Sequence, residues 1–216
     1  MKPLFIVFEG IDGAGTTTQC ECLCARLRLE GHDVVQTREP GGTEACERIR
    51  DLVLNPALKS LDAVTELLLM GASRRQHVAE LIEPSLRSGK PVISDRYAQS
   101  SVAYQGIGRG LGVDLVRRIN EIATGGLTAD LTIFFDLDVN TALHRRRART
   151  GEDRLELEGI EFQAAVRQAF LDLAGEAPTQ SLLVDADKPI EDLAQHVYQA
   201  LLARFPHQRL GFHRCV

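Results

Sequence analysis

The chain has 216 residues, of which 44% are hydrophobic and 25% are charged, and its formal net charge is -5. This length and balance indicate one globular domain with a sizeable core and exclude a disordered chain. The negative charge argues against a general nucleic-acid binder, and no run of residues is long and apolar enough to span a membrane.

The amino-terminal run and the cysteines indicate a cytoplasmic protein. The run "MKPLFIVFEG" is too short for a signal peptide and lacks a cleavage site. No paired C-x-x-C spacing for zinc or disulfides occurs among the five cysteines, which are Cys20, Cys22, Cys24, Cys46 and Cys215. Cys20 and Cys24 are one helical turn apart, and we expect them to be small buried side chains.

The first predicted elements are a strand, a glycine loop and a helix. The apolar run Leu4–Glu9 precedes the glycines, and Thr16–Glu30 is helix-prone up to Gly31. Backbone N–H groups in such a loop, together with the N-terminus of the next helix, bind phosphates. The predicted phosphate-binding residues are Gly10, Ile11, Asp12, Gly13, Ala14, Gly15, Thr16, Thr17 and Thr18.

One position departs from the phosphate-loop pattern G-x-x-x-x-G-K-[ST], because Thr16 stands where the lysine is expected. That ammonium normally lies against the outer phosphates, and the loss of one preorganised donor costs on the order of 3 kcal/mol, about a hundredfold in rate. Thr17 keeps the hydroxyl that binds Mg²⁺. We therefore expect phosphate binding to survive and catalysis to be weaker.

Four further strand candidates are separated by helical segments, and they lie at 33–37, 91–95, 131–137 and 181–185. Apolar strands alternating with helices predict a parallel sheet covered on both faces, which is an α/β fold of three layers. Ligands bind beyond the carboxyl ends of such strands. The residues expected at that edge are Glu9, Arg38, Asp95, Arg96 and Asp136.

The connecting segments carry several polar motifs. Residues 61–89 predict one helix with leucines mostly in the core, and His77 on it is expected to be structural because phosphoryl transfer to a phosphate needs no strong base. Thr43 and Ser100 are candidate helix caps. Asp95 and Arg96 either form a structural salt bridge or belong to a site at the strand end.

The segment 145–159 is charged and interrupted by Gly151, and it predicts a mobile excursion between two helical stretches. Its basic run Arg145–Arg147 is compatible both with a solvated helix face and with phosphate binding. The tail at 206–216 shows no clear periodicity.

Several separated motifs together resemble the thymidylate kinase family, of the bacterial type with arginines in a lid. They are "FEGIDGAG-TTQ" around Thr16, "TREPGGT" (37–43), "RRQHV" (74–78), "DRY" (95–97), "SSVAYQG" (100–106) and "GEDRLE" (151–156). The resemblance covers Leu4 to about Phe205. It implies one P-loop kinase domain (1–205) with a five-stranded sheet and a lid at about 145–159, which transfers a phosphoryl group from Mg-ATP to dTMP as a homodimer.

The resemblance also implies roles for individual residues. Asp12, Arg96, Arg149 and Arg154 would be catalytic, and Thr17 and Asp95 would serve Mg²⁺, Asp95 through water. Asp185, Ala186 and Lys188 would lie near adenine. The implied acceptor site comprises Glu39, Pro40, Arg50, Met70, Arg74, Arg96, Ser100, Ser101, Tyr104 and Gln105.

Within the acceptor site the resemblance places Arg74 and Arg96 at the phosphate, Ser101 and Gln105 at the thymine edge, and Tyr104 against the sugar. Arg50 resembles a family arginine near the acceptor phosphate, although an isolated arginine on a helix is usually a surface charge. Met70 stands where the family usually has phenylalanine stacked on thymine.

The sequence leaves three functions open. The first is a thymidylate kinase in which lid arginines replace part of the missing lysine charge. The second is a nucleotide-binding homologue that has lost catalysis, supported by Thr16 and Met70. The third, supported by Met70 alone, is a kinase for another nucleoside monophosphate.

Overall fold

The computed structural model describes residues 2–147 and 153–206, and in this part of the chain five strands form one sheet. All neighbouring strands pair in parallel, in the order β2-β3-β1-β4-β5. The predicted parallel sheet is therefore confirmed, with strand ends displaced by one or two residues. The strands are β1 (Phe5–Gly10), β2 (Val35–Arg38), β3 (Val92–Asp95), β4 (Leu131–Asp136) and β5 (Ser181–Asp185).

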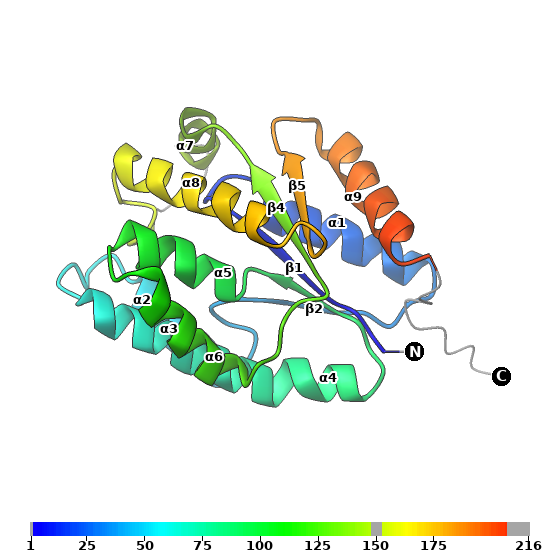
Figure 1. Cartoon of the computed structure of the whole chain (residues 1–216), viewed down its shortest axis with the longest axis horizontal. Helices are drawn as coiled ribbons and strands as arrows, with labels where there is room; N and C mark the ends of the chain where they lie inside the picture. The colour runs from blue at the N-terminus through cyan, green and yellow to red at the C-terminus, as the bar shows by residue number, and fades with distance from the viewer. Residues whose placement is uncertain (1, 148–152, 207–216) are drawn as a thin grey trace.

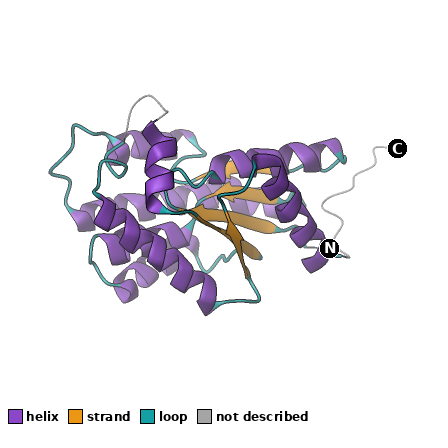
Figure 2. Cartoon of the chain, turned by 90° about the horizontal axis from the view of Figure 1, so that it is seen from above, coloured by secondary structure: helices purple, strands orange, loops and turns teal. Residues whose placement is uncertain are grey.

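Helices cover both faces of this sheet, as Figure 1 and the view from above in Figure 2 show. The α-helices are α1 (Thr16–Leu29), α2 (Glu44–Leu54), α3 (Ala63–His77), α4 (Glu83–Arg87), α5 (Ala98–Ser101), α6 (Val113–Thr124), α7 (Val139–Arg147), α8 (Ile160–Glu176) and α9 (Ile190–Arg204). Two π-helical segments, η1 (Val78–Ile82) and η2 (Val102–Gly108), continue α3 and α5.

Alternating residues of β1 build the core on the two faces of the sheet. Phe5 and Val7 pack in a cluster with Val78 and Ile82 of η1. Ile6 and Phe8 belong to the larger cluster, which includes Leu23 and Leu27 of α1. Because both faces are covered, the strand is apolar at nearly every position.

The helix predicted over 61–89 is divided into three parts, α3, η1 and α4. Asp62 caps the start of α3, where its Oδ2 accepts hydrogen bonds from the backbone N–H groups of Val64 and Thr65 at 3.0 Å. Pro84 occupies the first turn of α4. Because proline has no N–H group and restricts the residue before it, the wider π-helical turn precedes it.

The two predicted caps differ from expectation in their contacts. Thr43 does occupy the N-cap position of α2, but its hydroxyl donates to Cys46 Sγ at 3.1 Å and caps no backbone N–H group. Ser100 is the third residue of α5 and so is not its cap. Its hydroxyl donates instead to Glu9 Oε2 at 2.5 Å, a contact across the sheet edge that no local pattern predicts.

The cysteines follow the expectation of small packed side chains. Cys20 and Cys24 are buried on α1, and all cysteines in the described part of the chain are free. Among residues 2–147 and 153–206, no group of three or more metal-binding side chains comes together. None of the helices that the structure describes is long and apolar enough to cross a membrane.

Candidate active site

The glycine loop connects the carboxyl end of β1 to the N-terminus of α1. Gly10 and Gly13 are required by close approach, because a Cβ on Gly10 would lie 2.9 Å from the carbonyl oxygen of Phe135, and one on Gly13 would lie 2.6 Å from that of Ala142. Gly13 also has a φ of 95°, which disfavours other residues. The loop is thus held between β4 and α7, with the first N–H groups of α1 at its end.

Thr17 and Asp95, the predicted magnesium residues, lie side by side. Thr17 Oγ1 donates to Asp95 Oδ2 at 2.5 Å. Asp95 Oδ1 is buried and has no hydrogen-bond partner among the residues that the structure describes. A buried carboxylate oxygen without a donor beside a hydroxyl suits a hard cation or one of its water ligands, so these two residues fit Mg²⁺.

The predicted acceptor residues line one cavity. All ten are present: Glu39, Pro40, Arg50, Met70, Arg74, Arg96, Ser100, Ser101, Tyr104 and Gln105. The cavity is also lined by Asp12, and by four residues that sequence reasoning missed, namely Leu54, Tyr97, Asp153 and Leu155. Three of these four belong to the motifs "DRY" and "GEDRLE". The sequence therefore marked these positions, but roles were predicted only for the charged residues Asp95, Arg96 and Arg154 beside them.

Arg96 joins the cavity to the glycine loop. Its Nη2 donates to Asp12 Oδ1 at 2.6 Å and its Nη1 to the carbonyl oxygen of Gly10 at 2.8 Å, while the Tyr104 hydroxyl donates to Asp12 Oδ2 at 2.8 Å. Arg96 and Asp95 therefore do not pair with each other, and the salt-bridge alternative is wrong. Burial alone would lower the pKa of Arg96, but the surrounding Tyr104 and carboxyl groups raise it overall, so Arg96 is held as a cation.

Glu9 supports the turn that carries Arg96, whose φ of 72° makes it the one non-glycine residue with positive φ in the described chain. Glu9 is fully buried and accepts hydrogen bonds from the backbone N–H groups of Tyr97 at 3.0 Å and Ser100 at 3.2 Å. Burial raises the pKa of Glu9 to about 7, although the bonds from Ser100 and the charge of Arg96 oppose the rise. In the sequence, Glu9 could be recognised only by its position at the end of the first predicted strand.

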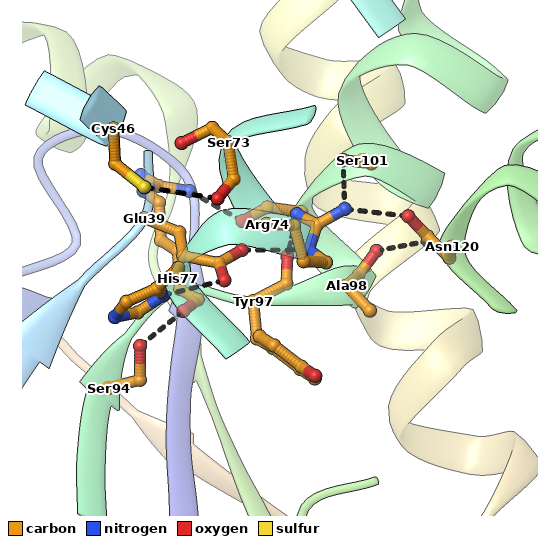
Figure 3. Close-up of polar contacts among 12 residues, drawn as sticks. Glu39, Cys46, Ser73, Arg74, His77, Ser94, Tyr97, Ala98, Ser101 and Asn120 are labelled. Carbon is orange, nitrogen blue, oxygen red and sulfur yellow. Dashed lines mark hydrogen bonds and ion pairs between the residues drawn. The ribbon is translucent and has the colours of Figure 1, made fainter. Parts of the chain in front are cut away.

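Arg74 is buried and lines the cavity. Figure 3 shows its side chain among Glu39, Ser101 and Asn120. Its Nε donates to Glu39 Oε2 at 2.8 Å, and its Nη groups donate to Ser101 Oγ, Asn120 Oδ1 and the Tyr97 carbonyl oxygen at 3.0, 2.6 and 2.9 Å. A guanidinium has five N–H donors. Four of them are bound by residues of the described chain, so one N–H of Arg74 has no acceptor there. The two parallel N–H groups that would bind a phosphate in a bidentate way are therefore already engaged within the protein.

His77 is structural, as predicted. It is fully buried, and its Nδ1 lies 2.9 Å from Glu39 Oε1 (Figure 3). Its Nε2 lies 2.7 Å from Thr37 Oγ1. Both ring nitrogens are therefore engaged within the protein. Glu39 is held between His77 and Arg74, so it orients the cavity wall.

Arg154 does not lie over the glycine loop, which corrects the predicted placement. It is 7% exposed, its Nε donates to the Val53 carbonyl oxygen at 2.9 Å, and its Nη2 pairs with Glu66. Glu66 is fully buried and also accepts from Gln105 Nε2 at 2.7 Å and Arg109 Nη2 at 3.3 Å. Arg154 thus packs against α2 and α3. Arg149, the other predicted lid arginine, lies outside the described residues.

Arg50 is more than a surface charge. It lines the cavity, and its Nη1 donates to the Pro40 carbonyl oxygen at 2.8 Å. Burial lowers the pKa of Arg50, and the cations Arg38 and Arg96 lower it further. The carboxyl groups of Glu47 and Asp153 oppose this fall. Such crowding of cations at one side of a cavity favours an anionic ligand.

Of the three residues predicted to lie near adenine, only Lys188 lines the cavity at the glycine loop. Lys188 lines a second cavity together with Arg145 and the loop residues Gly13, Ala14, Gly15 and Thr18. Asp185 and Ala186 are not in its lining: Asp185 Oδ1 accepts from the Asp187 N–H at 3.1 Å, and the Ala186 carbonyl oxygen accepts from Arg145 Nη1 at 3.1 Å. Their contacts shape the strand-to-helix turn before α9.

Comparison with known proteins gives a consistent result. The model of the family "Thymidylate kinase" matches residues 8–197. The thymidylate kinase of Deinococcus radiodurans is 48% identical over 201 residues, which are 93% of this chain and 97% of that protein. That of Pseudomonas entomophila is 48% identical over 202 residues, 94% and 96% of the two chains. The crystal structure of thymidylate kinase from Ehrlichia chaffeensis superposes with a TM-score of 0.75 at 33% identity, over 93% of this chain and 99% of that one.

Proposed function

Because the chain belongs to the thymidylate kinase family, we propose that it transfers the γ-phosphoryl group of Mg-ATP to the 5′-phosphate of dTMP and forms dTDP. The observation that supports this best is the position of Asp12. It belongs to the glycine loop and also lines the acceptor cavity, so a phosphate donor on the loop and an acceptor in the cavity would meet beside it.

The acceptor phosphate is assigned to Arg50 and Arg96. In the described residues, three N–H donors of Arg96 are bound to Gly10, Ser100 and Asp12, which leaves its Nε and one Nη2 donor. Within the described residues Arg50 donates one hydrogen bond, to the Pro40 carbonyl oxygen, and the cations around it favour an anion. Two partly free guanidinium groups can bind phosphate oxygens in the bidentate way that suits them.

The base is assigned to the wall formed by Arg74 and Gln105. Gln105 Oε1 is buried and has no hydrogen-bond partner within residues 2–147 and 153–206, while its Nε2 is bound by Glu66. A thymine edge offers an N–H donor for this oxygen and a carbonyl oxygen for the single remaining N–H of Arg74. This replaces the predicted phosphate role of Arg74, and Met70 would supply an apolar contact to the ring.

Catalysis in this proposal comes from positioning and charge. Thr17 and Asp95 would hold Mg²⁺, which neutralises negative charge on the terminal phosphates when it is bound. Asp12, fixed by Arg96 and Tyr104, would orient the acceptor side. Arg149 remains the predicted lid arginine for the transferred group.

The broader setting is also proposed from the family resemblance. We expect a cytoplasmic homodimer that acts on two small nucleotides, with neither nucleic acid nor a membrane as partner. Sedimentation analysis of the protein at micromolar concentration would test the dimer, and a monomer throughout that range would contradict it.

The test of the function is steady-state formation of dTDP from ATP, Mg²⁺ and dTMP, with dUMP and dCMP in parallel. Turnover selective for dTMP is expected. If ATP and dTMP bind by calorimetry and no product forms, the nucleotide-binding homologue is the better description. If another monophosphate is preferred, the substrate assignment is wrong.

A further inference from the structure

Arg146 is a buried arginine whose guanidinium has no hydrogen-bond partner in the described part of the chain. The residue is 3% exposed, and none of its Nε, Nη1 and Nη2 atoms has a hydrogen-bond partner in residues 2–147 and 153–206. Buried guanidinium groups are normally paired, since an uncompensated charge in the interior is costly. Arg146 therefore does not belong to a solvated helix face, which was one of the two interpretations of the basic run. A buried guanidinium with free N–H donors favours an anionic ligand.

The two neighbouring arginines in the same turn behave differently. Arg145 forms an ion pair with Asp187 at 3.1 Å, and Arg147 is exposed. The negative end of the α7 dipole attracts cations in this last turn, which explains a basic run there but does not explain a buried guanidinium without acceptors. Arg146 needs a separate explanation.

The face of α7 that carries Arg146 packs on the glycine loop. The carbonyl oxygen of Ala142 lies 2.6 Å from where a Cβ on Gly13 would be, and Figure 1 shows α7 beside the loop that leads from β1 to α1. Arg146 follows Ala142 by four residues, so the two share one helical face. Long side chains on a helix extend back toward its N-terminus, which directs the Arg146 side chain over the Ala142 turn and toward the loop.

Nearby charges agree with this direction. Burial raises the pKa of the Glu156 carboxyl, the charges of Asp153 and Asp12 raise it further, and the charge of Arg146 opposes the rise. Glu156 therefore lies within electrostatic range of both Arg146 and Asp12.

We propose that Arg146 binds the outer phosphates of ATP and supplies, from α7, positive charge that Thr16 cannot supply from α1. The inference rests on the proposed function, because it takes ATP as the ligand of the loop. It assigns a binding residue distinct from the lid arginine Arg149. It also accounts together for a buried guanidinium that has no hydrogen-bond acceptor in the described residues and for a phosphate loop without its usual lysine.

Binding measurements test this without requiring turnover. ATP, ADP and AMP are titrated calorimetrically into the unchanged protein and into Arg146→Ala, Arg146→Lys and Arg87→Ala. Arg87 is an exposed arginine of α4 paired with Glu83, and it serves as the control for loss of one positive charge. Arg146→Ala is expected to weaken ATP at least tenfold and AMP by less than threefold, with Arg146→Lys between them. Equal losses for ATP and AMP, or no loss, would overturn the proposal.

The stability of the ligand-free variants separates binding from a structural role. Removing an unpaired buried charge is expected to leave the melting temperature of Arg146→Ala unchanged or higher, whereas a residue that holds α7 in place would lower it. A lower melting temperature together with unchanged ATP affinity would contradict the proposal. Arg146→Gln, which keeps most of the side-chain volume, provides the same comparison if the alanine variant does not fold.

A double-mutant cycle with Thr16→Lys tests the compensation directly. If both positions serve the same phosphates, the loss of ATP affinity caused by Arg146→Ala will be several-fold smaller when Lys replaces Thr16. An equal loss in both backgrounds would reject compensation. Absence of dTDP formation by the unchanged protein would instead count against the proposed function, and the ATP titrations would still decide the role of Arg146.

Discussion

Replacing Glu9 with glutamine is expected to change how the stability of the protein depends on pH. Glu9 is fully buried at the end of β1, and its pKa is raised from 4.5 to about 7 chiefly by that burial. Between these two values the folded protein binds more protons than the unfolded chain. The stabilising contribution is therefore complete below pH 4.5 and is lost progressively as the pH rises to about 7.

The size of this change in stability follows from the difference between the two pKa values of Glu9, 4.5 and about 7. Each pH unit corresponds to about 1.4 kcal/mol for one group, so the rise from 4.5 to about 7 is worth on the order of 3 kcal/mol. Glutamine is uncharged and nearly the same shape, and its side-chain oxygen can still accept from the backbone N–H groups of Tyr97 and Ser100. Relative to the unchanged protein, Glu9→Gln should gain stability by about this amount between pH 4.5 and 7.5.

Urea unfolding at half-unit pH steps measures this difference, because the other titrating groups are common to both proteins and cancel. Glu121→Gln, at an exposed position of α6, is the matched control, and its difference from the unchanged protein should stay flat over the same range. A constant difference between Glu9→Gln and the unchanged protein would refute the reasoning, since it would mean that Glu9 ionises equally easily in the folded and unfolded states.

Four further substitutions have distinct expected outcomes. Arg154→Ala should lower the free energy of unfolding in urea by about 3 kcal/mol or more, because it leaves buried Glu66 with one arginine fewer; unchanged stability would contradict this. Thr16→Lys should raise kcat by up to about a hundredfold in the dTDP assay, and no gain would show that the position is uncoupled from catalysis. Met70→Phe should lower KM for dTMP severalfold, in line with about 1 kcal/mol for an aromatic contact, and an unchanged KM would argue against base contact at this position. Arg149→Ala should lower turnover, and unaltered turnover would refute the lid interpretation.

The sheet was predictable because its physical cause is local in sequence. A parallel strand covered on both faces must be apolar at almost every position, and turns or glycines must separate it from the helices. The run at 181–185 coincides with β5, and the other strands moved by one or two residues. The residues predicted for the acceptor site were found for a different reason: eight of the ten belong to motifs that were recognised together, and all ten line one cavity.

The errors come from contacts between residues far apart in sequence. Arg154 pairs with Glu66, 88 positions away, and no pattern around either residue indicates the pairing. The hydroxyl of Ser100 binds Glu9 across 91 positions, so its expected capping role was replaced by a contact that only the fold creates. Local spacing predicts which side chains share a face, but it does not identify what covers that face.

Arg146 shows how local and distant information combine. The run "HRRRART" is uniformly basic, and from composition alone every arginine in it is equivalent. Helical spacing places both Arg145 and Arg146 beside Ala142, because they follow it by three and four residues. Burial separates them: Arg146 is 3% exposed, whereas Arg145 pairs with Asp187. What the sequence lacks is the contact between Ala142 and Gly13, which turns that face toward the glycine loop. Phosphoryl transfer requires positive charge at a place in space, and an arginine on α7 can meet that requirement as well as a lysine on α1 if both reach the same oxygens. The departure at Thr16 and the unpaired charge at Arg146 are then two parts of one electrostatic arrangement.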